Sequence, residues 1–267
     1  MNKEQLRSPA EVRERLVTTC QEMARRLRGL LDAKTRVADE THALRKFGKS
    51  LRGGMTLLGV PKSARRAVGA VGKMLGAPRD SVSRSTTWHR LGLAEGPHAG
   101  ESSVLAISAL LGVHARSATR RPPAAAVEWE EIRLQHASTA LLALAADDLE
   151  ARVEAGRRHL AKQLRKRLKT VRHHPGASEL HELRKALKAW IGALHHLGED
   201  ADKSLVEYAD LLGDVNDLEV LGSWLEAHGF SPALAPLPWK ALRTRLNRLS
   251  ETILEGAPEV RRVVSAA

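Results

Sequence analysis

The segment Glu179-Leu180-His181-Glu182-Leu183-Arg184-Lys185 has an earlier counterpart in the chain, Glu40-Thr41-His42-Ala43-Leu44-Arg45-Lys46. The two copies agree at five of seven positions over an offset of 139, the distance from residue 42 to residue 181. Two further segments, residues 75–80 and 212–217, each begin with Leu-Gly, end with Asp and follow in the same order. Two matches in one order indicate a duplicated unit.

Each copy fits one amphipathic helix. When the residues are projected at about 100° per residue, apolar side chains fill one arc and cations fill the adjoining arc. The first cationic arc holds His42, Arg45, Lys46, Lys49 and Arg52, and the second holds His181, Arg184, Lys185 and Lys188. The histidines recur at equivalent positions, where an imidazole can donate a hydrogen bond to an anion.

Cations at similar spacing occur in the neighbouring predicted helices. They are Lys162, Arg165, Lys166, Lys169 and Arg172 before the second copy, Arg25 and Arg28 before the first, and Arg66 and Lys73 after the first. If the helices of each unit pack antiparallel, these edges converge on a shared groove. Like charges three or four residues apart repel each other, so the pattern predicts an anionic ligand. The alternative interpretation is a set of solvated helix faces.

Composition predicts an all-α globular protein. The 267 residues include 43 Lys and Arg against 31 Asp and Glu, a formal net charge of +12, with 43% hydrophobic residues. Good helix formers far outnumber the β-branched and aromatic residues that strands prefer. Gly and Pro punctuation predicts about ten helices, and Pro122-Pro123 is the best boundary. We therefore expect repeats at residues 1–122 and 123–267, with four to five helices each.

Cysteine content and hydropathy favour the cytoplasm. The single cysteine, Cys20, excludes an intramolecular disulfide and a cysteine-based zinc cluster. The N-terminus carries no apolar signal segment, and the longest apolar run, residues 140–146, is too short to span a bilayer. We expect neither secretion nor membrane insertion.

With its two His-x-x-Arg-Lys motifs, each followed by Leu-Gly-x-x-(Arg/Asn)-Asp, the sequence resembles the CHAD family, the conserved histidine α-helical domain. The resemblance implies two bundles related by a pseudo-two-fold axis around a basic central channel. It also implies binding of inorganic polyphosphate, often at polyphosphate or storage granules. The implied ligand contacts are His42, Arg45, Lys46, Lys49, His181, Arg184, Lys185 and Lys188. The second copy departs from the motif at Asn216, where the first has Arg79.

Two other functions compete with polyphosphate binding. Net charge equally favours nucleic acid, but the few aromatics form no stacking platform and no helix-turn-helix is evident, so we expect DNA only as a non-specific competitor. A metal-dependent phosphohydrolase needs clustered His and carboxylate ligands. The nearest candidates are His195-His196 with Glu199 and Asp200, and we interpret the histidine pair as surface or helix-end residues. We therefore expect no catalytic residue, metal or cofactor, and interpret Asp80 and Asp217 as helix caps.

Overall fold

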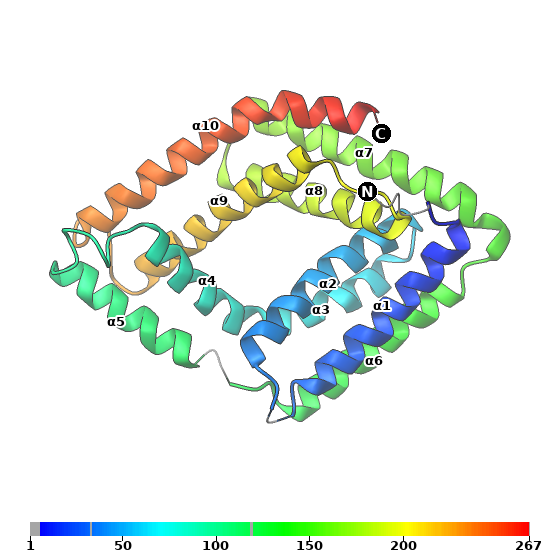
Figure 1. Cartoon of the computed structure of the whole chain (residues 1–267), viewed down its shortest axis with the longest axis horizontal. Coiled ribbons are helices and arrows are strands. Elements are labelled where there is room, and N and C mark those ends of the chain that lie inside the picture. Colours follow the sequence, from blue (N-terminus) through cyan, green and yellow to red (C-terminus); the bar gives the residue numbers. More distant parts are fainter. Residues whose placement is uncertain (1–5, 33, 118–119, 267) are drawn as a thin grey trace.

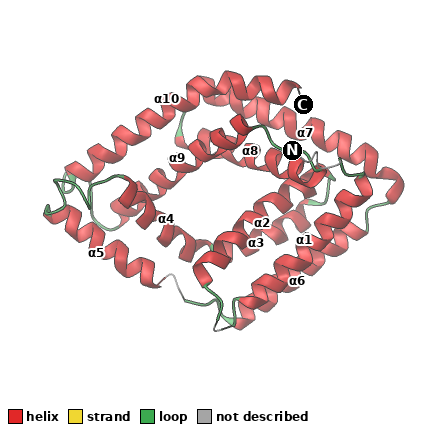
Figure 2. Ribbon diagram, in the orientation of Figure 1, coloured by secondary structure: helices red, strands yellow, loops and turns green. Residues whose placement is uncertain are grey.

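The computed structural model describes residues 6–32, 34–117 and 120–266, without the side chains of residues 77–79, 117 and 266. Within these ranges the chain forms ten α-helices, one short 3-10 turn and no strand, which confirms the all-α prediction (Figure 2). The helices are α1 (Pro9–Gly29), α2 (Val37–Leu57), α3 (Lys62–Met74), α4 (Gly76–Arg90), α5 (Ser102–Ser117), α6 (Ala124–Leu142), α7 (Leu149–His173), α8 (Ala177–Leu197), α9 (Lys203–Ala227) and α10 (Pro236–Ala266), with the turn η1 at Ala146–Asp148.

Local signals fix several helix ends. Helix α1 begins with a capping box, in which the Ser8 hydroxyl accepts a hydrogen bond from the Glu11 amide and the Glu11 carboxylate accepts one from the Ser8 amide. Helix α8 ends at Gly198, whose φ of 79° lies in the left-handed region that glycine tolerates best. The start of α1 and the end of α8 are therefore set by residues that can be recognised in the sequence.

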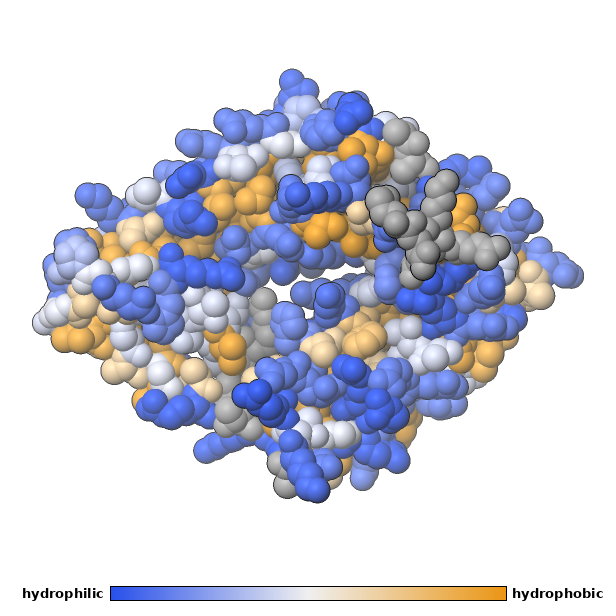
Figure 3. Space-filling view, viewed as in Figure 1, coloured by the Kyte–Doolittle hydropathy of each residue, from blue (hydrophilic) through white to orange (hydrophobic). Residues whose placement is uncertain are grey.

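The helices surround a central opening. In the view of Figure 1, α2, α3, α4, α8 and α9 border the opening, with α1 and α6 outside it on one side and α7 and α10 on the other. The space-filling view shows the opening between hydrophilic side chains (Figure 3). Hydrophobic side chains instead pack between neighbouring helices, in a core that includes Leu16, Leu44, Leu183 and Leu221.

The two helices that carry the His motifs pack directly against each other. At their crossing, a Cβ added to Gly192 would lie 2.9 Å from the Ser50 Cα, and one added to Gly53 would lie 3.1 Å from the Ala193 amide nitrogen. Glycine at both positions lets the two backbones approach closely. Gly53 and Gly192 are 139 residues apart, so the two His helices cross at equivalent positions.

Packing between the predicted repeats is not confined to that crossing. Helix α6, which begins directly after Pro123, packs against α1 and α3, and α4 packs against α9. The division near residue 122 and the pseudo-two-fold axis stay predictions. No described helix is long and apolar enough to cross a membrane.

Candidate functional site

The amphipathic character predicted for both His helices is confirmed. On α2, Leu44 and Leu51 are fully buried, while His42 and Lys46 are exposed. On α8, Leu183 and Leu187 are buried, Lys185 and His181 are exposed, and Arg184 and Lys188 are half-buried. Equivalent motif positions therefore have the same environment in both halves.

The His motif and the Leu-Gly motif meet in both halves of the chain. A Cβ added to Gly76 would lie 3.5 Å from Arg45 Nη1, and one added to Gly213 would lie 3.8 Å from Arg184 Nε. Arg45 Nη1 also donates a hydrogen bond of 2.6 Å to the carbonyl of Gly72. The glycine of the Leu-Gly motif thus lies beside the arginine of the His motif in both halves. This contact was not predicted, although the similar spacing of the two motifs in both copies pointed to it.

Polar partners position the cations of the second half. His181 Nδ1 lies 2.8 Å from Oδ1 of Asn216, the residue at which the Leu-Gly motif departs from the family pattern. Lys185 pairs with Glu182 at 2.7 Å and Lys188 with Asp210 at 3.3 Å. The hydrogen bond from Lys185 holds the pKa of Glu182 below its ordinary value. Ion pairs this exposed contribute roughly 0–1 kcal/mol, so an anionic ligand can displace the carboxylates.

The first half presents several cations without carboxylate partners. Among the residues that the structure describes, no carboxylate pairs with His42, Lys46, Arg52, Arg66 or Lys73, and all five side chains are exposed. Arg45 and Lys49 are half-buried and take part in further contacts. Together these seven residues form the cationic surface of α2 and α3.

Two predicted ligands, Arg25 and Arg28, are engaged elsewhere. Arg25 forms a bidentate pair with Glu22 at 2.7 and 2.8 Å. Arg28 forms one with Glu131 of α6 at 2.6 and 2.8 Å. Both hydrogen-bonded pairs raise the arginine pKa. The two guanidinium groups are therefore held in ion pairs within α1 and between α1 and α6.

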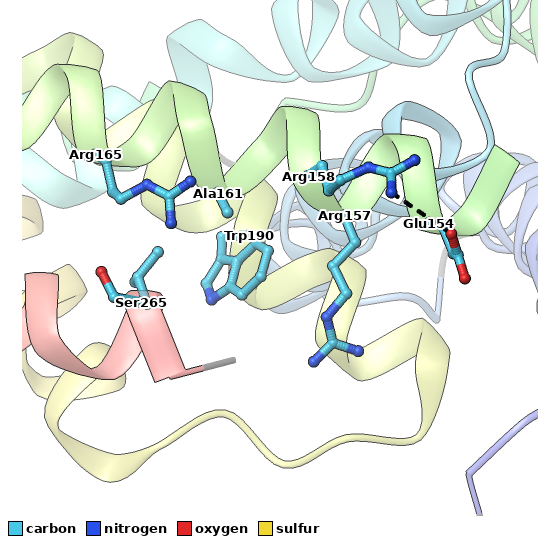
Figure 4. Close-up of a pocket in the computed structure, with 8 residues that line it drawn as sticks. Glu154, Arg157, Arg158, Ala161, Arg165, Trp190 and Ser265 are labelled. Atoms are coloured by element: carbon cyan, nitrogen blue, oxygen red, sulfur yellow. Dashed lines mark ion pairs between the residues drawn. The ribbon is translucent and has the colours of Figure 1, made fainter. Parts of the chain in front are cut away.

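The cations of α7 are exposed but do not all join the α8 arc. The exposed side chains are Lys162, Arg165, Lys166, Lys169 and Arg172. Arg165 lines a pocket with Trp190 of α8 and Ser265 of α10 (Figure 4). Nine residues at about 100° per residue place Trp190 on the opposite side of α8 from His181. The structure therefore places Arg165 away from the His motif of its own repeat.

The interpretation of the two motif aspartates as helix caps was wrong, because Asp80 lies inside α4 and Asp217 lies inside α9. His196 lies in the last turn of α8, as the helix-end interpretation predicts, but only 2% of it is exposed, and it packs against Ser50 and Gly54 of α2. Glu199, a candidate metal ligand, forms a bidentate ion pair with Arg157. In the described part of the chain, no group of three or more His, Cys, Asp or Glu side chains could hold a metal ion.

The fold defines a class of all-helical proteins in which the helices surround a hydrophilic opening. The family model described as CHAD domain matches residues 23–226, so the chain belongs to the CHAD family. The crystal structure of the CHAD domain from the plant Ricinus communis is similar in fold, with a TM-score of 0.60 at 19% sequence identity. The match covers 96% of this chain and 93% of that chain. No curated protein matches the sequence.

Proposed function

We propose that the protein binds inorganic polyphosphate through the cationic surfaces of α2 and α8. The observation that carries the proposal is the equivalent placement of the two His motifs. In each half the motif arginine lies beside a glycine, and the next lysine, Lys46 or Lys185, is exposed. Membership of the CHAD family is consistent with this ligand.

The mechanism is electrostatic capture without covalent chemistry. Arginine and lysine form charge-assisted hydrogen bonds to phosphate oxygens, and the bound polyanion replaces the weak surface carboxylate pairs. Each phosphate that meets a cation releases condensed counterions, so affinity falls as salt rises. Longer chains meet more cations at once and bind more tightly.

The test is a titration with long-chain polyphosphate at near-physiological salt. The test variant is Lys46→Glu/Lys185→Glu, which reverses one exposed charge in each half. The matched control is Arg245→Glu/Arg248→Glu, which makes the same change in net charge at two exposed positions of α10. Circular dichroism shows whether each variant retains the helical fold.

We expect the test variant to lose at least about tenfold in affinity, because two charge-assisted contacts become repulsive. Its salt dependence should also be shallower, since fewer counterions are released. The control should bind like the wild type. An equal loss in both variants would contradict a dedicated site and leave only generic charge.

Duplex DNA at matched charge provides the competition arm. A dedicated polyphosphate site should resist duplex DNA, because no helix-turn-helix that would read a duplex is evident in the sequence. Displacement by DNA at equal charge would favour non-specific nucleic-acid binding instead. Release of orthophosphate, with or without divalent metal, would favour the phosphohydrolase.

Location at polyphosphate or storage granules in the cytoplasm belongs to the same proposal. The family resemblance supports it, and bound polyphosphate would supply the attachment. Co-sedimentation of the protein with isolated granules tests it. Granule binding that survives in the Lys46→Glu/Lys185→Glu variant would show that attachment does not depend on the polyphosphate site.

A further inference from the structure

A pocket of about 370 Å³ opens between α7, α8 and the end of α10. Figure 4 shows Trp190 at its centre, with Arg165 and Ser265 on one side and Arg157 and Arg158 on the other. A pocket of this size matches the lower range of volumes that hold small molecules. It lies on the side of α8 opposite the His181 arc, so it is separate from the proposed polyphosphate surface.

The floor of the pocket contains a hydrogen-bond donor without an acceptor. Trp190 is only 1% exposed, and its indole Nε1 has no hydrogen-bond partner in the structure. A buried N–H that lacks an acceptor is costly, and most such groups in folded proteins are satisfied by protein, water or ligand. A ligand in the pocket that carries an acceptor atom would therefore satisfy the indole N–H.

The rim of the pocket supplies positive charge at one end. Arg157 is held by its bidentate pair with Glu199, and the exposed Arg158 lies 3.6 Å from Glu154. No carboxylate pairs with Arg165 among the described residues, and its side chain is exposed. The end of the pocket beside Arg165 is therefore cationic.

The walls beside the indole are apolar or small. Ala161 of α7 and Val264 of α10 are both buried or nearly so, and Ser265 lies next to them. An inorganic anion alone would make no contact with this apolar surface. An apolar body attached to the anionic group would cover it.

We infer that this pocket binds a small organic anion, a carboxylate or a phosphate monoester on an apolar body. One acid oxygen accepts hydrogen bonds from Trp190 Nε1 and from the Arg165 guanidinium. The apolar body packs against Ala161 and Val264. The carboxylate and the phosphate share this chemistry, and the experiment separates them.

The experiment follows the Trp190 indole N–H by ¹⁵N–¹H NMR in the full chain. The probes are benzoate, phenyl phosphate, inorganic phosphate and the neutral benzyl alcohol. Trp190→Phe assigns the indole signal. Arg165→Ala tests the cationic end, and Arg245→Ala, an exposed arginine of α10 outside the pocket, is the matched control.

We expect saturable shifts of the Trp190 signal with benzoate or phenyl phosphate, and the tighter of the two identifies the acid group. Arg165→Ala should weaken the response at least about tenfold, while Arg245→Ala should not change it. No shift with either aromatic anion, an equal shift with benzyl alcohol, or an equal loss in both variants would overturn the inference. The Lys46→Glu/Lys185→Glu variant should respond like the wild type, so failure of polyphosphate binding and failure of this pocket are distinguishable.

Discussion

The imidazole of His196 is buried where α8 crosses α2. Its Nε2 lies 3.3 Å from the Ser50 hydroxyl oxygen, and its Nδ1 has no hydrogen-bond partner among the described residues. Burial, together with the nearby positive charges of His195, Arg15 and Arg7, lowers the pKa of His196 to about 3. The folded protein therefore holds this imidazole neutral, whereas the unfolded chain lets it protonate near the ordinary histidine pKa of about 6.5.

This difference predicts a loss of stability in acid. Below about pH 6.5 the unfolded state binds one proton that the folded state excludes. The free energy of unfolding therefore decreases as the pH is lowered. From about pH 7.5 to about pH 5 the contribution of His196 should be about 2 kcal/mol. Urea unfolding at both pH values measures it. His196→Gln lacks this titration and should lose about 2 kcal/mol less over the same range; equal losses would contradict the assignment.

Residue roles were predictable from the sequence where they depended on local pattern. The exposure of Lys46 and Lys185 follows from the amphipathic arc, and the structure agrees. The burial of His196 was not predictable in that way, because it depends on the approach of a helix about 140 residues away in sequence. The contact between Arg184 and Gly213 likewise needs the packing of α8 on α9.

At the scale of helices, the crossing of α2 and α8 depends on glycine. Gly192→Ala would place a Cβ 2.9 Å from both the Cα and the carbonyl oxygen of Ser50, and backbone atoms cannot rotate aside. We expect a loss of about 1–3 kcal/mol in the free energy of unfolding. Chemical denaturation measures the change.

Gly72→Ala is the matched control for this crossing. An added Cβ at Gly72 meets nothing within 4 Å, so the substitution should leave stability unchanged or raise it by up to about 1 kcal/mol through helix propensity. If both alanine variants lose the same stability, the effect lies in the helices themselves and the crossing is not constrained as described.

The positions of the helices were more predictable than the helices against which they pack. Periodicity predicted helices at both His motifs, and the described structure has them at α2 and α8. The cations of α7 have the same sequence spacing as those of α2. Arg165 of α7 nevertheless lies beside Trp190 in a pocket shared with α10. Spacing within one helix determines which side chains share a face, but it does not determine which neighbour that face meets.

At the scale of the whole molecule, the chain crosses between its halves more than once. The buried face of α6, including Leu134 and Leu141, covers α1 and α3, although α6 begins after the Pro122-Pro123 boundary. A chain that ends at residue 122 exposes the apolar surface that α6 covers. We expect it to be less helical per residue and more rapidly cleaved by protease than a chain that ends at residue 145.

Circular dichroism and limited proteolysis of the two truncated chains test this expectation. The full chain, in which α2 also packs on α8, should unfold in one cooperative transition by both far-ultraviolet and tryptophan signals. A fragment of residues 1–122 that is as helical and as resistant as the longer one would instead support an independent first unit.

The central opening has a consequence for hydration and charge. The molecule exposes 14720 Å² to solvent, whereas a compact monomer of its mass, 29.2 kDa, would expose about 11,500 Å². The additional area is in contact with water. The net charge of +12 is therefore distributed over a larger surface than in a compact monomer of the same mass. At low ionic strength this net positive charge repels itself, so we expect multivalent anions to raise the melting temperature by reducing the repulsion.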